Sequence, residues 1–238
     1  MMQIIPVIDL LHGKVVHAKQ GKRDDYQAIQ SQLCDGSEPL TIVAALLKLY
    51  PFQTLYIADI DAIMGVGNSD ALIESIIITY PNITFWLDCG IKQMNARWLY
   101  NASNIKPVLG SENIESLQVY RAISYACQSK HVLSLDYSAT SAMGISDLHN
   151  KAHFWPDETI CMTLNAVGSA NGVDKLRLQE LIRLNSARKS PSKLYAAGGV
   201  RNMDDLRTLA NIKLAGALIA TALHNGSITS KDLEGFLT

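Results

Sequence analysis

Short apolar runs alternate with longer amphipathic stretches along the whole chain. The short runs are rich in aliphatic and β-branched residues, which is typical of parallel strands buried on both faces. Eight of them are predicted as strands: Ile4–Ile8, Thr54–Ile60, Ile83–Leu87, Lys106–Leu109, His131–Leu135, Thr159–Leu164, Lys193–Ala196 and Ala217–Ile219.

The stretches between these runs carry apolar residues at helical spacing. Helices are predicted over Leu40–Leu49, Ala71–Thr79, Ile114–Cys127, Lys175–Leu184 and Met203–Ala210. This alternation indicates an α/β fold, and eight repeats favour closure into a (β/α)8 TIM barrel over an open sheet. A dinucleotide-binding open sheet is disfavoured because no GxGxxG motif follows an early strand. We therefore expect a single barrel domain over residues 1–238.

The two halves of the chain resemble each other. Cys89–Met94 is similar to Gly198–Met203, which begins 109 residues later. The pairs Gly110-Ser111 and Ala220-Thr221 follow at nearly the same offset. This internal duplication predicts a barrel made of two similar half-barrels.

Length, composition and charge agree with this fold and narrow the function. The chain has 238 residues, close to the ~250 of a typical α/β barrel. Its net charge of −1 gives no reason to expect a nucleic acid or a membrane surface as a partner. The first residues lack a signal-type stretch and no apolar run could span a membrane, so we expect a cytoplasmic protein. The cysteines are scattered without ligand spacing, so no metal site is expected.

Glycine-bearing turns with a basic residue follow the third and seventh strands, at Asp88–Lys92 and Ala197–Arg201. Glycine lets a phosphate approach backbone N–H groups, and barrels often bind phosphate after strands seven and eight. Tight turns that need glycine for their backbone angles are the alternative, and the charge of Asp88 opposes an anion in the first half. The predicted phosphate sites comprise Gly90, Gly110 and Ser111 in one half and Gly198, Gly199, Ala220 and Thr221 in the other.

Asp9 and Asp136 directly follow strands and should face the rim where barrel enzymes carry catalytic carboxylates. Two carboxylates across one pocket can divide acid and base roles, although each could instead cap a helix or pair with a lysine. His12 and His17 flank the first loop, where surface or hydrogen-bonding roles are more common. The three tryptophans are expected to be packing residues, and Trp155, in the long connection after the fifth strand, is the one best placed to stack on a substrate ring instead.

In this order and spacing, the motifs resemble those of the histidine-biosynthesis barrels. This family comprises ProFAR isomerase (phosphoribosylformimino-5-aminoimidazole carboxamide ribotide isomerase) and the imidazole glycerol phosphate synthase cyclase subunit. The opening Ile4–Leu10, followed by Gly13–Val16 and Gln20-Gly21, is more similar to the isomerase than to the cyclase. Ala197–Leu206 is similar to the seventh-strand phosphate motif, and the resemblance runs from about Ile4 to Asn225.

The resemblance implies a substrate with a phosphate at each end and an Amadori rearrangement of an aminoaldose to an aminoketose, without cofactor or metal. Asp9 corresponds to the family's base, and Asp136 to a fifth-strand aspartate. The positions expected to bind substrate are Lys19, Gly21, Ser169 and Arg201. The expected partner is a small phosphorylated sugar, bound by a monomer or a weak homo-oligomer.

Three departures from the family pattern affect this site. Val167 stands where the family carries its usual general acid, an aspartate, and losing a positioned acid costs ~10²–10⁴-fold in rate. The third-strand Gly-Gly-Gly is Asp88-Cys89-Gly90 here, and the eighth-strand Gly-Lys/Arg is Ala220-Thr221. One hypothesis is therefore an isomerase of ProFAR or of a related phosphorylated aminosugar, with Asp136 as the acid. The other is a diverged paralogue, either an enzyme of C1-cofactor biosynthesis or a non-catalytic protein that binds a phosphorylated metabolite.

Overall fold

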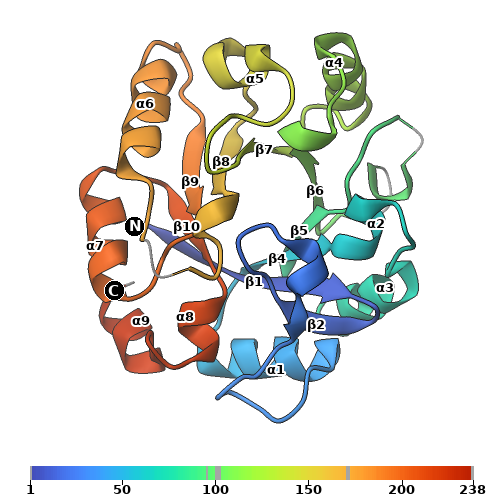
Figure 1. The fold of residues 1–238 in the computed structure, drawn as a ribbon, viewed down its shortest axis with the longest axis vertical. Coiled ribbons are helices and arrows are strands. Elements are labelled where there is room, and N and C mark those ends of the chain that lie inside the picture. The colour runs from blue at the N-terminus through green and yellow to red at the C-terminus, as the bar shows by residue number, and fades with distance from the viewer. Residues whose placement is uncertain (1, 95, 100–102, 170–171, 237–238) are drawn as a thin grey trace.

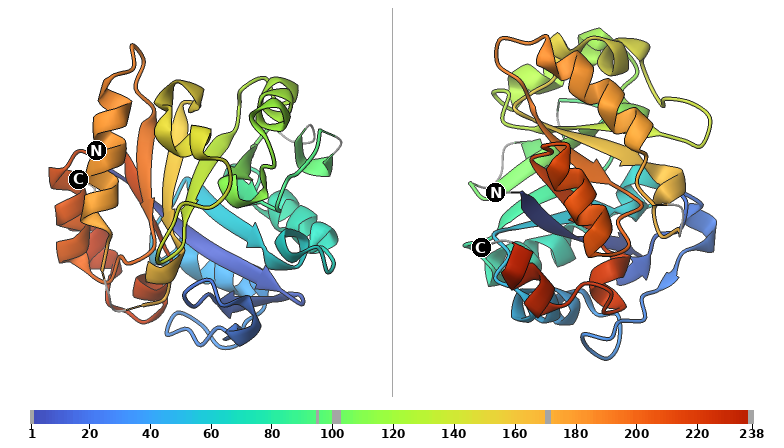
Figure 2. Two further views of the ribbon diagram at one scale, coloured as in Figure 1. Left: turned by 45° about the horizontal axis from the view of Figure 1, so that its top comes forward. Right: turned by 90° about the vertical axis from the view of Figure 1, so that its left-hand side faces the viewer.

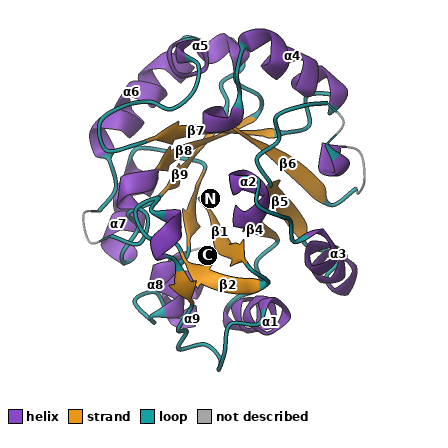
Figure 3. Ribbon diagram, turned by 45° about the vertical axis from the view of Figure 1, so that its right-hand side comes forward, coloured by secondary structure: helices purple, strands orange, loops and turns teal. Residues whose placement is uncertain are grey.

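Eight parallel strands form a closed ring in the computed structural model, which describes residues 2–94, 96–99, 103–169 and 172–236. The strands are β1 (Gln3–Leu11), β4 (Thr54–Asp59), β5 (Thr84–Asp88), β6 (Ile105–Gly110), β7 (Val132–Tyr137), β8 (Glu158–Thr163), β9 (Lys193–Ala197) and β10 (Gly216–Ile219). Each pairs with the next, and β10 pairs back with β1, from Gln3 beside Gly216 to Pro6 beside Ile219. This closure confirms the predicted TIM barrel, and Figure 3 shows the strands with the helices outside them.

The strands match the predicted runs because both of their faces are buried. One face points into the barrel, where Trp86 and Tyr195 meet edge to face with their ring centroids 4.8 Å apart. The other face packs against the helices, as do Ile8 on β1 and Ile57 on β4. A strand enclosed in this way has no polar face, which is why its sequence is a continuous apolar run.

The five predicted helices are all present in the outer layer (Figure 1), with ends that differ by a few residues. The helix after β6 was predicted from Ile114 but begins at Leu117. Ser116 caps this helix by accepting a hydrogen bond from the Val119 N–H. Between β5 and β6, the described residues contain only a 3-10 turn at Arg97–Leu99. The outer helices are α1 (Pro39–Leu49), α3 (Asp70–Thr79), α4 (Leu117–Ala126), α6 (Lys175–Ser186), α7 (Met203–Asn211) and α9 (Ser230–Phe236).

Short elements after the strands were not predicted from the sequence. In the connection after β1, which is blue in Figure 2, β2 (Lys14–His17) turns back antiparallel to β1, and β3 (Gln27–Ala28) pairs with β2. Short helices follow other strands, namely α2 (Ile60–Met64), α5 (Ser146–Asn150) and α8 (Thr221–His224). Several of these segments reach the C-terminal ends of the strands and so shape the mouth of the barrel.

Candidate active site

A cavity of about 430 Å³ lies at the C-terminal ends of the strands, where barrel enzymes place their active sites. Three aspartates line it: Asp9 from β1, Asp88 from β5 and Asp136 from β7. The turns after β8, β9 and β10, which lie between β7 and β1 in the ring, also line it. The two predicted catalytic carboxylates therefore face the same cavity, together with a third that the sequence did not assign to catalysis.

The carboxyl group of Asp9 accepts no hydrogen bond from any described residue. Burial, and to a lesser extent the charge of Asp88, raises the pKa of its carboxyl group to about 7. A free carboxyl group with such a pKa is partly ionised at neutral pH, which is the state that a general base requires.

Asp136 is held by several donors. Its Oδ1 accepts a hydrogen bond from Ser134 Oγ at 2.6 Å, and its Oδ2 accepts from Ser111 Oγ at 3.2 Å and from the Glu112 N–H at 3.1 Å. Its own N–H donates to Ser111 Oγ at 2.9 Å. Burial nevertheless raises the pKa of Asp136 to about 7, against the lowering effect of the Ser134 hydrogen bond. This carboxyl group is thus fixed in position and can hold a proton near neutral pH.

Asp88 is a third buried carboxyl group in this cavity, beside Asp9 and Asp136. It accepts hydrogen bonds from Tyr56 OH at 3.0 Å and from the Gly90 N–H at 3.1 Å, and burial raises its pKa to about 6. A Cβ built on Gly110 would lie 3.8 Å from Asp88 Oδ2 and 3.2 Å from Asp136 Oδ2. The two carboxylates therefore flank Gly110 and make one side of the mouth acidic.

The connection after β1 contributes polar cavity residues that sequence reasoning missed. Arg23 pairs with Glu112, which ties this connection to the end of β6. Burial, and then the charge of Asp9, raises the pKa of Tyr26 to about 12, so Tyr26 can donate a hydrogen bond there at neutral pH. The available signal was the length of the connection, since long rim loops are commonly functional.

The turns after β9 and β10 carry unused donors. Gly198, Gly199, Ala220 and Thr221 all line the cavity. The N–H groups of Gly198, Gly199 and Ala220 donate to no other described residue. Gly199 has φ +83°, and a Cβ there would lie 2.1 Å from the Gly172 carbonyl oxygen, so no other residue fits. Converging backbone N–H groups of this kind favour an anion, as the phosphate prediction requires.

The matching residues of the other half are arranged differently. Gly90, Gly110 and Ser111 do not line the cavity, and the Gly90 N–H and the Ser111 hydroxyl donate to the protein's own carboxylates. A Cβ on Gly90 would lie 2.8 Å from the Ile63 Cα, so this glycine is needed for close packing against α2. These donors are thus already occupied within the fold.

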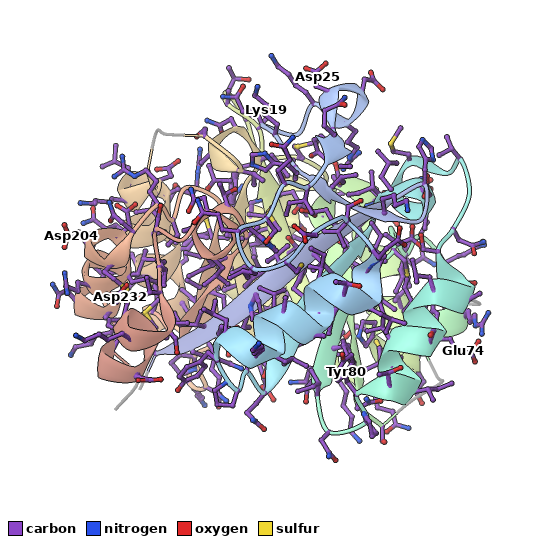
Figure 4. All side chains as sticks on the ribbon, turned by 90° about the horizontal axis from the view of Figure 1, so that it is seen from below. Lys19, Asp25, Glu74, Tyr80, Asp204 and Asp232 are labelled. Carbon is purple, nitrogen blue, oxygen red and sulfur yellow. The ribbon has the colours of Figure 1, made fainter. Side chains whose placement is uncertain are left out.

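The predicted substrate-binding residues divide into two pairs. Ser169 and Arg201 line the cavity, whereas Lys19 and Gly21 do not. Lys19 is exposed and lies at the edge of the molecule (Figure 4). The guanidinium of Arg201 binds Asp205, with Nε 2.8 Å from Oδ2, at the start of α7.

His17 and Val167 lie beside the phosphate turn. His17 lines the cavity, with its Nε2 3.1 Å from Thr221 Oγ1. Val167 also lines the cavity, and its Cγ2 would be 3.3 Å from a Cβ on Gly198. The Gln20 N–H donates to the Val167 carbonyl at 2.9 Å, so the first and sixth loops of the barrel are joined.

Two other rim residues have structural roles. Trp155 is a packing residue, as expected for the tryptophans, and does not stack on a substrate, because its side chain is only 2% exposed and lies outside the cavity. Its Nε1 donates to the Leu148 carbonyl at 2.6 Å, which holds the rim segment against α5. His12 is exposed, and its Nδ1 lies 3.0 Å from Asp61 Oδ1.

Neither a metal cluster nor a membrane-spanning helix is found in the described part of the chain. Within residues 2–94, 96–99, 103–169 and 172–236, no group of three His, Cys, Asp or Glu side chains could hold a metal ion. Over the same ranges, no helix is long and apolar enough to cross a membrane.

Comparison with known proteins shows the family to which the chain belongs. The sequence profile described as "Histidine biosynthesis protein" matches residues 3–229, nearly the whole barrel. The chain belongs to this family. A protein of Methanocaldococcus jannaschii without an assigned function is 31% identical over 98% of this chain and 96% of its own length. The present chain is also 28% identical to an imidazole-4-carboxamide isomerase of Myxococcus xanthus, over 95% of both chains. It is 23% identical to the corresponding isomerase of Thioalkalivibrio sulfidiphilus, over 95% of this chain and 96% of that one.

Proposed function

We propose that this family member is an aldose–ketose isomerase that performs an Amadori-type rearrangement on a phosphorylated aminosugar. The observation that carries the proposal is the pair of strand-end carboxyl groups, Asp9 and Asp136, which face one cavity and both have a pKa of about 7. Near neutral pH such a pair can supply one ionised base and one protonated acid. The isomerase names of two relatives support the same class of reaction.

The reaction needs one proton given and one proton taken. Asp136, in its protonated form, donates to the ring oxygen of the aminosugar, the C1–O bond breaks, and the nitrogen lone pair forms a protonated imine at C1. Asp9 then removes the proton from C2, and the C2–H electron pair forms a C1=C2 double bond while the imine nitrogen becomes neutral. The proton on Asp9 returns to C1 while the C2 hydroxyl gives its proton to Asp136, which forms the ketone at C2 and restores both carboxyl groups to their starting states.

The roles follow from the two environments. Asp9 has no donor among the described residues, so its oxygens are free to take a proton. Asp136 is fixed by Ser134, Ser111 and Glu112, as suits an acid that must be held in line with a leaving oxygen. Val167 has no proton to give, so Asp136 takes the role that the sixth-loop aspartate has in the family pattern.

The test is turnover of two substrates, ProFAR and an N-aryl 5-phosphoribosylamine, followed by NMR of the sugar protons. Asp9→Asn should lower kcat ~10²–10⁴-fold, because it removes the base. Asp25→Asn is the matched control, since Asp25 is an exposed carboxylate on the same connection after β1 (Figure 4) and should leave kcat unchanged. Absence of turnover of both substrates at high enzyme concentration would overturn the proposal.

A second candidate function is supported by Val167. If Asp136 donates no proton, the same cavity would bind a phosphorylated metabolite without converting it, as in a diverged paralogue. Binding of both test substrates without turnover, and with equal affinity in wild type and Asp9→Asn, would favour this second candidate.

A further inference from the structure

The two halves of the barrel mouth are related by the internal repeat but differ in chemistry. Gly199 corresponds to Gly90, and Thr221 to Ser111, at the offsets of the repeat. At the same offset, Asp88 corresponds to Ala197. One half therefore carries a buried carboxylate where the other carries a methyl group.

In the half that contains β9 and β10, the anion donors are available. The Gly199 N–H donates to no described residue, and neither does the Ala222 N–H in α8, which follows β10. Gly199 and Ala222 both line the cavity. The two acidic side chains that follow the β9 turn are paired with arginines, Asp204 with Arg207 and Asp205 with Arg201.

In the half that contains β5 and β6, the equivalent donors are taken. The Gly90 N–H donates to Asp88, and the Glu112 N–H, which corresponds to that of Ala222, donates to Asp136. The Ser111 hydroxyl also donates to Asp136. A phosphate here would face Asp88 and Asp136 without these donors, and like charges at such short range repel.

We propose that the substrate carries a single phosphate, bound at the β9–β10 turns, and that its other end presents hydrogen-bond donors, hydroxyl or ammonium, to Asp88 and Asp136. This inference rests on the proposed function, because it specifies the substrate class of the same cavity. It separates this chain from the isomerase relatives, whose name describes a compound with two phosphoribosyl groups. The acidic half of the mouth thus selects against the second phosphate.

The test compares two ligands of one sugar by isothermal titration, ribulose 5-phosphate and ribulose 1,5-bisphosphate. The titrations are run at about pH 8, where the three carboxyl groups are mainly ionised. The monophosphate should bind one molecule per chain, and the bisphosphate should bind no more tightly. Bisphosphate binding more than ~10-fold tighter than that of the monophosphate would overturn the inference, since a working second phosphate site gives at least this gain.

Reciprocal substitutions across the repeat make the test specific. Ala197→Asp copies the acidic half onto the β9–β10 half and should abolish binding of the monophosphate. Asp88→Ala copies the other way and should raise affinity for the bisphosphate, because it removes a repelling charge, and lower affinity for the monophosphate, because it removes a hydrogen-bond acceptor. Asp88→Asn removes the charge but can still accept from Gly90, and it replaces Asp88→Ala if thermal unfolding shows that the alanine variant does not fold.

The outcomes are separable from those of the isomerase assay, because titration requires no turnover. If Asp88→Asn gains no affinity for the bisphosphate, the carboxylate is not the cause of selection and the inference fails. If the wild type binds the monophosphate at one site but converts neither substrate, the proposed isomerase activity fails and the single-phosphate inference stands.

Discussion

Asp9 should make the stability of the folded protein fall as pH rises, and replacing it should remove that loss. Its pKa is about 7 in the folded chain, against an ordinary value of 3.8 for an exposed aspartate. Between these two values the folded state binds more protons than the unfolded state, so the free energy of unfolding decreases with increasing pH. The contribution is fully present below about pH 4 and is lost as pH passes through about 7.

The magnitude follows from the difference between these two pKa values, which is about three. A difference of one in pKa corresponds to about 1.4 kcal/mol, so ionising Asp9 in the folded state costs up to about 4 kcal/mol by pH 8. Asn has a similar shape and no charge to bury. We therefore expect Asp9→Asn to match the wild type near pH 4 and to exceed its free energy of unfolding by up to about 4 kcal/mol near pH 8.

Urea unfolding of both proteins, followed by circular dichroism at several pH values between about 4 and 8, measures this difference. Asp88 and Asp136 are present in both proteins, so their contributions to the pH dependence largely cancel in the comparison. The exposed Asp25→Asn variant is the control and should follow the wild type throughout. Parallel curves for wild type and Asp9→Asn would refute the reasoning, since they would mean that burial does not hold the Asp9 proton.

Two further predictions concern Val167 and Trp155. Val167→Asp, which introduces a carboxyl group beside the β9 turn, should change isomerase kcat less than ~10-fold, because Asp136 already supplies the proton. A rise of ~10²-fold or more would show that Asp136 is not the acid. Trp155→Phe should lower the free energy of unfolding by ~1–3 kcal/mol, because it leaves the Leu148 carbonyl without its donor, and should leave KM unchanged. A raised KM in this variant would show that the ring contacts the substrate after all.

The strand pattern was predictable because burial on both faces leaves a strong sequence signal. It placed the eight strands to within a few residues, and their ends placed Asp9 and Asp136 at one rim. Asp88 was recognised from the sequence as a charge that opposes a phosphate, but its hydrogen bonds to Tyr56 and Gly90 depend on the closed barrel. No local pattern reports pairings between residues that are so distant along the chain.

The loops were less predictable, because their contacts have no period. The pairing of Arg23 with Glu112 joins residues that are 89 positions apart. A stacking role for Trp155 stayed open in the sequence for the same reason, since a rim loop can turn its largest side chain inward as easily as toward a substrate. The length of the connection after β1 is a signal of function, but the sequence does not show which of its side chains reach the cavity.

The contact between the first loop, which follows β1, and the sixth loop, which follows β8, affects ligand exchange. A Cβ on Gly168 would lie 2.3 Å from the Ala18 carbonyl oxygen, and the nearby Gln20 N–H donates to the Val167 carbonyl. Two segments that are packed this closely and joined by a hydrogen bond move together. Any opening of the mouth on this side must therefore move both loops at once, so the rates of substrate entry and product release depend on residues in both.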